Sequence, residues 1–262
     1  MSFEEFVSNC LLFICGVLTA LVSAQLRLKW RASPPPPPPP PSPAAPSAVA
    51  PRLPSAKQAL SLIKARRSVK PKDMSGAIIP TATVELLLEA ANWAPTHGLT
   101  EPWRFVVLDR AACGRLIDMR RAHLERTFDG TASVLAKMVA KIESKRGDLA
   151  RISHQIAIIS KRVPNAKGRM MPQWEDDASV ACAVQNLHLL ATALNVVGYW
   201  TSSGTGRAGY LESEESAAWL GHSPNSGDKC LGLFMLGRTT KDMSKFRSAR
   251  GPMSAKCSWV SS

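Results

Sequence analysis

The sequence lacks the histidine and cysteine patterns of metal sites and disulfide frameworks. Its five histidines include no H-x-x-x-H pair, and its six cysteines include no C-x-x-C pair. We therefore predict no metal ligands. The cysteines are also too dispersed for a disulfide framework, so we expect free thiols in a reducing compartment. They are Cys10, Cys15, Cys113, Cys182, Cys230 and Cys257.

Motifs of several large enzyme classes are missing as well. There is no P-loop and no serine nucleophile elbow, which argues against P-loop NTPases and serine hydrolases. The net charge of +13 favours anionic partners such as phosphorylated cofactors or anionic lipid. Zinc knuckles, RNP-like runs and continuous basic helices are absent, so nucleic acid is not an expected partner.

An uncharged run occupies residues 6–26. As a helix these 21 residues would extend about 30 Å, enough to span a bilayer core. Acids precede the run and bases follow it, so the remainder of the chain should face the cytosol. We predict an anchor over residues 1–30 of a single-pass membrane protein. The rival is a signal peptide cleaved before Gln25, which the acids near its start disfavour.

Prolines dominate residues 31–54, where twelve of the twenty in the chain lie between Pro34 and Pro54. Proline fixes φ and has no amide hydrogen, so this linker is expected to form extended polyproline II. It would act as a stiff spacer. Residues 34–54 could also dock a proline-reading module.

Residues 55–247 show the mixed patterns of one globular domain. Ser55 and Thr81 are candidate N-caps of two amphipathic helices. Two charged helices should follow near 111–126 and 132–146, and a long apolar helix at 178–194 should be buried in the core or against another subunit. Strands are expected at 103–108, 156–160, 198–203 and 229–238. The pattern predicts an α+β or α/β core, followed by a loose tail at 248–262.

Three polar clusters stand at element boundaries. In the first, Arg66 and Arg67 precede Ser68 at the end of a helix, where fixed cations and a hydroxyl suit a phosphate or an electron-rich ring edge. Ordinary helix C-terminal basicity explains the same residues. Any one cluster alone has such a structural explanation.

The second and third clusters suit a flat ligand. Pro95 and Pro102 stiffen a loop that carries His97, with Trp93 just before it; a packed corner is the alternative. Trp200, Thr201 and Ser202 follow the apolar helix, where small hydroxyl residues leave room for a planar ligand. A solvated turn would need no such role.

The order of these clusters resembles that of the nitroreductase family of flavoproteins. Arg-Arg-Ser is followed by Ala-Pro, then Pro-Trp-x-Phe-Val-Val, then "WEDDASVACAVQNLHLLATAL", "YWTSSG" and "DKCLGLFMLGR". The resemblance covers about residues 55–238 and is strongest to the small, minimal members. It implies a homodimeric α+β fold with a central antiparallel or mixed sheet flanked by helices, and FMN bound where the subunits meet.

The resemblance also implies roles for residues. Arg66, Arg67 and Ser68 would hold the phosphate and ribityl side of FMN, with Arg67 near N1 and O2. Trp93 and His97 would lie beside the flavin, His97 from the partner subunit. Trp200, Thr201 and Ser202 would contact the other edge of the flavin. Arg238 would be a further ligand of the phosphate.

In that family FMN carries the chemistry. NADH or NADPH would deliver a hydride to flavin N5, and a small electron-poor acceptor, such as a nitroaromatic or quinone, would then take the electrons in a ping-pong cycle. No side chain is required as a catalytic nucleophile or base.

Two alternatives remain at this point. Iodotyrosine deiodinase is a relative with an N-terminal membrane helix and the string "TEPW", seen here at 100–103. Its lid uses a tyrosine, whereas residues 111–151 contain none. The other alternative is a membrane-tethered FMN-binding protein without catalysis.

Overall fold

The computed structural model describes residues 53–202, 204–205, 209–246 and 248–260. The predicted anchor at 1–30, and nearly all of the linker with its docking segment, lie outside these residues and stay predictions. Among the described helices, none combines the length and apolar character needed to cross a bilayer.

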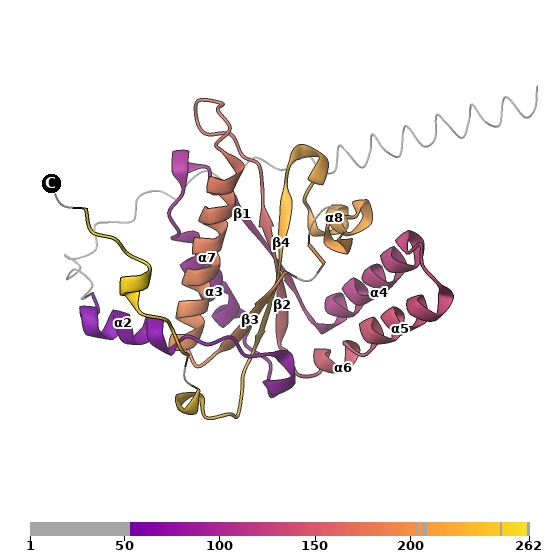
Figure 1. Cartoon of the computed structure of the whole chain (residues 1–262), viewed down its shortest axis with the longest axis horizontal. Helices are drawn as coiled ribbons and strands as arrows, with labels where there is room; N and C mark the ends of the chain where they lie inside the picture. Colours follow the sequence, from indigo (N-terminus) through magenta and orange to yellow (C-terminus); the bar gives the residue numbers. More distant parts are fainter. Residues whose placement is uncertain (1–52, 203, 206–208, 247, 261–262) are drawn as a thin grey trace, which may run out of the picture. The chain divides into compact units, whose positions relative to one another are not determined.

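Four strands form one antiparallel sheet in the order β1-β2-β4-β3 (Figure 1). A parallel bridge between Ser68 and Gly198 adds the segment after the first helix to the free edge of β3. The predicted α+β fold with an antiparallel sheet is therefore confirmed. The strands are β1 (Trp103–Leu108), β2 (His154–Ser160), β3 (Val197–Thr201) and β4 (Lys229–Gly237).

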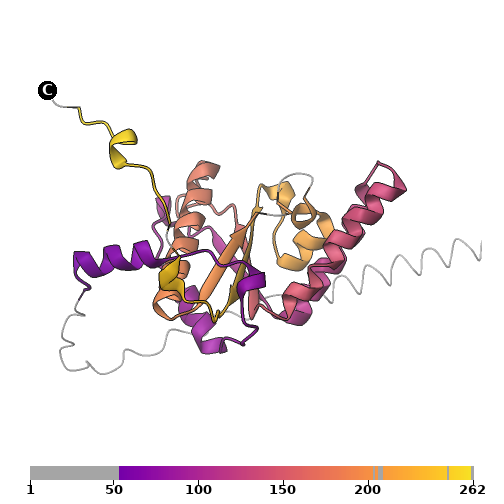
Figure 2. The ribbon, with the colours of Figure 1, turned by 60° about the horizontal axis from the view of Figure 1, so that its bottom comes forward.

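Helices cover both faces of the sheet. The two on one face are α3 (Thr81–Asn92) and α7 (Gln173–Ala193). On the other face lie α4 (Arg110–Thr127), α5 (Ala132–Glu143), α6 (Arg146–Leu149) and α8 (Glu214–Leu220). Figure 2 shows α4 and α5 as a hairpin that extends away from the sheet.

Short 3-10 helices and one further α-helix complete the described part. The α-helix is α2 (Ala56–Ala65). The 3-10 helices are η1 (Pro71–Asp73), η2 (His97–Leu99), η3 (Tyr210–Glu212), η4 (Pro224–Ser226), η5 (Met243–Lys245) and η6 (Met253–Ala255). Around η6, residues 248–260 are exposed.

The two core layers follow from the period of the central strand. Ile156 and Ile158 pack in the layer under α3 and α7, whereas Ala157 and Ile159 pack in the layer under α4. Successive side chains of a strand point to opposite faces. Because both faces of β2 are covered, its apolar run is continuous instead of alternating.

One side of α7 is buried and the other is not. Val180, Val184 and Leu187 face the core, but Trp174 is 69% exposed and Cys182 is exposed. The predicted burial of this helix in a core is thus confirmed for one side only.

The N-terminal ends of α2 and α3 can be compared with the two predicted N-caps. Ser55 is confirmed as the N-cap of α2, where its side chain accepts from the amide of Gln58 in a capping box. Thr81 is wrong as a cap, because it is the first residue inside α3. The carbonyl of Pro80 accepts from the amides of Thr83 and Val84, so the helix begins one residue earlier than the prediction required.

A β-bulge interrupts the pairing of β2 with β4. Ile158 pairs with Gly232 and Ile159 with Cys230, which leaves Leu231 as an extra residue. Gly232 has φ +118°, and a Cβ at this position would overlap the carbonyl of Thr201. Glycine is therefore required at the bulge.

Gly198 gives a test of the packing between β3 and β4. A Cβ at Gly198 would overlap the ring of Phe234, which is fully buried. We expect Gly198→Ala to lower the free energy of unfolding by about 1–3 kcal/mol, because overpacking forces the core to shift. Urea unfolding followed by circular dichroism measures the change.

The matched control is Gly147→Ala in α6. Its new Cβ would meet no atom within 4 Å, and alanine favours helix, so its free energy of unfolding should stay equal or rise slightly. If both variants unfold alike, the close contact between Gly198 and Phe234 does not limit this core.

Candidate functional site

A cavity of about 390 Å³ lies between the sheet and the helices α4, α5 and α6. This volume falls within the range of small-molecule sites. The floor comes from the sheet, the wall from the helices and the rim from η1. The lining residues are Lys70, Pro71, Lys72, Cys113, Leu116, Ile117, Arg120, Ile142, Lys145, Asp148, Leu149, Ile152, Gln155, Tyr199, Thr201, Tyr210, Leu233 and Met235.

The cavity contains neutral hydroxyl and thiol groups. Burial raises the pKa of Tyr210 to about 12, although the nearby Arg120 opposes the shift. Burial also raises the pKa of the Cys113 thiol to about 12. At neutral pH both groups keep their protons, so Cys113 is not a thiolate nucleophile.

The first predicted cluster runs beside β3. The amide of Val69 donates to the carbonyl of Gly198 at 3.0 Å, and His188 of α7 donates from Nε2 to the carbonyl of Arg67 at 3.0 Å. The Arg67 guanidinium donates to backbone carbonyls. Its Nε donates to that of Phe246 at 3.0 Å, and its Nη1 donates to that of Lys64 at 2.5 Å. The backbone of this cluster is therefore firmly held.

Arg66 and Arg238 are the two remaining predicted phosphate ligands. Arg66 is half-buried and has no carboxylate partner among the residues described. Burial, then Arg250 and Arg67, lowers its pKa. Arg238 follows Gly237, which pairs with Val197 of β3, and its Nη1 donates to the carbonyl of Asn195 at 3.5 Å.

The second cluster lies elsewhere in the chain. His97 Nδ1 contacts Glu175 near the start of α7, and Trp93 donates from Nε1 to Glu89 at 2.8 Å. From Glu175 to His188, α7 rises about 20 Å at 1.5 Å per residue. One chain alone therefore does not bring His97 to the Arg66–Ser68 cluster.

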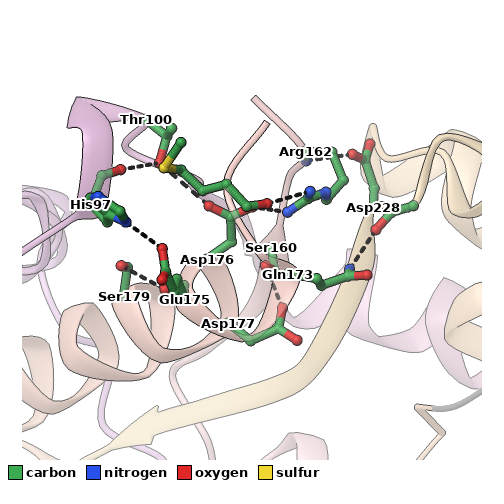
Figure 3. Close-up of polar contacts among 12 residues, drawn as sticks. His97, Thr100, Ser160, Arg162, Gln173, Glu175, Asp176, Asp177, Ser179 and Asp228 are labelled. Carbon is green, nitrogen blue, oxygen red and sulfur yellow. Dashed lines mark hydrogen bonds and ion pairs between the residues drawn. The ribbon is translucent and has the colours of Figure 1, made fainter. Parts of the chain in front are cut away.

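A buried polar network fixes the N-terminal end of α7 (Figure 3). Asp176 pairs with Arg162 and accepts from the hydroxyl of Thr100 at 3.4 Å. The amide of Arg162 donates to Asp228 at 2.8 Å, and Ser160 donates to Asp177 at 2.7 Å. The network ties η2, with His97, to α7 and to the ends of β2 and β4.

The third cluster divides between the two faces of the sheet. Trp200 packs against the core layer under α7, and its Nε1 donates to the carbonyl of Leu231 at 3.0 Å. Thr201, the next residue, lines the cavity. Ser202 is exposed, and its carbonyl accepts from the amide of Thr205 at 3.1 Å.

Three glycines follow β3 at a characteristic spacing. Residues 204–209, GTGRAG, match the G-x-G-x-x-G spacing of dinucleotide-binding loops. That motif acts between a strand of a parallel sheet and a helix that begins at the last glycine. Here β3 belongs to an antiparallel sheet, and the 3-10 helix η3 follows. This glycine spacing therefore does not indicate a dinucleotide-binding loop.

The sequence model of the nitroreductase family matches residues 63–238, about two thirds of the chain. This chain belongs to the nitroreductase family. The match begins before Arg66 and ends at Arg238, so it includes all three polar clusters. The resemblance seen in the sequence is confirmed.

Two curated relatives of this nitroreductase family member have related names. The chain is 26% identical over 143 residues to "Putative NAD(P)H nitroreductase YfhC" of Bacillus subtilis, covering 54% of this chain and 67% of the relative. It is 28% identical over 147 residues to YdjA of Escherichia coli, which has the same description, covering 55% and 72%.

Solved structures share the fold. A nitroreductase-like family protein from Bacillus cereus aligns with TM-score 0.60 and 24% identity over 80% of this chain and 100% of its own. NfnB of Mycobacterium smegmatis, an FMN-dependent nitroreductase solved with NADPH, aligns with TM-score 0.56 and 20% identity over 79% and 99%. At these identities the likeness concerns the fold.

Several cavity residues were not predicted from the sequence. Lys70 could have been predicted, because it stands two residues after Ser68 on an extended segment whose Val69 is buried, so the two residues share a side of that segment. Lys72, Arg120 and Lys145 come from separate elements that no local pattern connects. Of the predicted residues, Thr201 alone lines this cavity. The predicted FMN contacts stay predictions.

His188 makes stability depend on pH. Burial, then Arg66, lowers its pKa to about 4, from 6.5 in the unfolded chain. Below pH 6.5 the unfolded chain binds the extra proton, so stability falls between pH 6.5 and 4, by at most about 3 kcal/mol. We expect His188→Gln, which keeps an amide donor, to remove this part of the slope in urea unfolding at each pH.

The control is His123→Gln on α4, where the histidine is only half-buried. It should keep the wild-type slope. If His188→Gln and wild type lose stability in parallel between pH 6.5 and 4, His188 is not the group responsible.

Proposed function

We propose that this chain is an FMN-dependent NAD(P)H oxidoreductase that reduces electron-poor acceptors, such as nitroaromatics or quinones, by ping-pong turnover. Family membership over residues 63–238 is the observation that carries the proposal. The names of YfhC and YdjA support NAD(P)H as the reductant. The FMN-dependent NfnB, and a structure from Desulfovibrio desulfuricans in complex with FMN at TM-score 0.51, support the cofactor.

The residues present fit FMN. A flavin mononucleotide needs a phosphate site and a slot for a flat ring. Ser68 pairs with Gly198 at the free edge of β3, Arg66 stands two residues before Ser68, and Arg238 follows β4, the strand next to β3. The neighbouring cavity, with Thr201 on its floor, has the volume of a ligand site. These residues would therefore hold the phosphate and receive the ring.

When bound, FMN would supply the electron transfer, and the protein would bind and orient the reactants. Arg66 would neutralise phosphate charge through charge-assisted hydrogen bonds. Arg67, with its carbonyl held by His188, would keep a fixed positive charge near the ring. Tyr210 and Cys113 stay protonated and serve as walls that exclude water.

We further propose that two copies pair to complete the site. Exposed apolar side chains lie on α2, at the C-cap of α3 and on α7, where Leu60 is 50%, Trp93 78% and Trp174 69% exposed. A second copy that covered them would remove apolar area from water. It could also bring its His97 to the first copy's Arg66–Ser68 cluster, which one chain alone does not achieve.

Sedimentation of the purified full-length chain in a mild detergent tests the pairing. We expect a dimer that persists at low micromolar concentration, and Trp174→Glu should shift it toward monomer because it buries a charge in the interface. A monomer at all accessible concentrations contradicts the pairing.

Colour and turnover test the function. The purified full-length chain should be yellow and should oxidise NADH or NADPH when nitrobenzene or menadione is added. Arg66→Ala should lower flavin affinity by roughly tenfold or more, since a charge-assisted hydrogen bond contributes about 1.5–3 kcal/mol. Fluorescence titration of the apoprotein with FMN measures this.

Lys137→Ala, at an exposed position on α5 that does not line the cavity, also removes one positive charge and should bind FMN like wild type. A yellow chain that stays inert with both nucleotides and several acceptors would be a flavin-binding protein without this activity. A colourless chain that takes up no FMN contradicts the proposal itself.

A further inference from the structure

The cavity contains no histidine, although the proposed reaction consumes a proton for every hydride that NAD(P)H supplies. Burial raises the pKa of both Tyr210 and Cys113 to about 12, so these two cavity groups are poor proton donors at neutral pH. Histidine exchanges its proton most readily near neutral pH. All five histidines lie in the described part of the chain, and none lines the cavity. A histidine donor would therefore come from outside the cavity.

His97 is the one exposed histidine of the five. His188 and His222 are buried, and His123 and His154 are half-buried. Burial lowers the pKa of His188 to about 4 and also lowers the pKa of His154, so both are neutral at pH 7. The side chain of His97 is 61% exposed. It can therefore meet a ligand that its own chain does not enclose.

Glu175 of α7 orients the His97 ring (Figure 3). Its carboxylate contacts Nδ1 and is 20% exposed. A carboxylate in this position fixes the orientation of the ring and stabilises the imidazolium. Within the described residues, Nε2 of His97 has no hydrogen-bond partner. The pair therefore has the arrangement of a general acid that donates from Nε2.

The backbone of His97 is tied to the buried network at the start of α7. The Thr100 hydroxyl lies 3.3 Å from the carbonyl oxygen of His97 and 3.4 Å from Asp176. Asp176 in turn pairs with Arg162. The imidazole is thus presented from a preorganised loop, which lowers the ordering cost of using it.

Other charged groups on the elements packed against this loop act less directly on the ring. Glu89 accepts from Trp93 at 2.8 Å, and Glu101, Lys167 and Arg169 are exposed to solvent, which screens them. Ion pairs occupy the rest: Asp176 with Arg162, Asp177 with Lys229, and Asp228 with Lys161. Glu175 is therefore the charge that governs His97.

The distance along α7 prevents His97 from serving the Arg66–Ser68 cluster of its own chain. The helix rises about 20 Å from Glu175 to His188, which bonds the carbonyl of Arg67. In the proposed pair, the second copy brings its His97 to this cluster. The donor and the cofactor site would then belong to different copies.

We propose that His97, held by Glu175, is the general acid that protonates the acceptor at the flavin site of the other copy. This inference rests on the proposed function and on its pairing. For a nitro group, NAD(P)H supplies a hydride with two electrons, and Nε2 of His97 supplies a proton. One N–O bond breaks, and its oxygen leaves as water with both hydrogens. The nitroso group and NAD(P)⁺ remain, and solvent returns a proton to His97.

Nitrobenzene and ferricyanide separate proton donation from electron transfer, because ferricyanide accepts an electron without a proton. The full-length, flavin-loaded chain is reduced with one equivalent of dithionite and mixed rapidly with each acceptor. His97→Gln should slow nitrobenzene reduction on the order of a hundredfold, the lower end of what general acid catalysis contributes. Its ferricyanide reduction and its affinity for FMN should match wild type.

Two further variants bracket this result. Glu175→Gln should also slow nitrobenzene reduction, because a neutral partner no longer stabilises the imidazolium, and should leave ferricyanide reduction unchanged. His123→Gln, which replaces a half-buried histidine on α4, should behave as wild type with both acceptors.

Mixing two variants tests whether His97 acts across the pair. In a mixed dimer of His97→Gln and Arg66→Ala, one site combines an intact Arg66 from one copy with an intact His97 from the other. At limiting FMN, nitrobenzene reduction by the mixture should exceed the mean of the separate variants. If His97 served its own chain, both sites would be damaged and the mixture would stay at that mean.

Chemical modification locates His97 without turnover. Diethyl pyrocarbonate modifies accessible histidine rings, and mass spectrometry identifies them. In the oxidised, flavin-loaded wild type, nitrobenzene should slow the modification of His97 but not of His123. Trp174→Glu, which should shift the dimer toward monomer, should lose this protection.

Several outcomes overturn the inference while the proposed function stands. These are a wild-type rate of nitrobenzene reduction in His97→Gln, an equal loss with ferricyanide, a mixture that stays at the mean, and no protection of His97 by nitrobenzene. If the flavin-loaded wild type reduces neither acceptor, the proposed function fails and the inference fails with it.

Discussion

The ion pair between Arg162 and Asp176 fixes the position of α7, and the arrangement of the polar clusters depends on that helix. Burial raises the pKa of Asp176, and Arg162 opposes the shift. Removing one partner of such a buried pair typically costs about 3–5 kcal/mol. With its N-terminal end fixed, α7 holds His97 at one end through Glu175 and the Arg67 carbonyl at the other through His188.

Strand alternation decides which predicted residues can meet a ligand in the cavity. Trp200 and Thr201 are adjacent, yet the first closes the core under α7 and the second opens onto the cavity. A slip of one residue in β3 would exchange these roles. The bonds from Val69 to Gly198 and from Trp200 to Leu231 hold the strand against such a slip.

Local patterns predicted most of the fold. The four strands and the long helices stand close to their expected positions, because continuous apolar runs and helical spacing are local properties. The exact first residue of a helix was harder to predict, because the N-cap of α3 is Pro80 and not Thr81. The site was harder, because Lys72 and Arg120 meet only when η1 and α4 approach the same sheet face. The separation of His97 from Arg66 follows from the length of α7, which no motif spacing expresses.

The bulge at Leu231 divides β4 into two parts of opposite phase. Cys230 and Leu233 belong to the same core layer although they are three residues apart, and Leu231 packs with the opposite layer. A simple alternating pattern would assign these side chains to the wrong faces. Even-numbered and odd-numbered positions therefore exchange core layers at Gly232, so β4 tolerates polar or larger side chains as two short strands would, each with its own alternation.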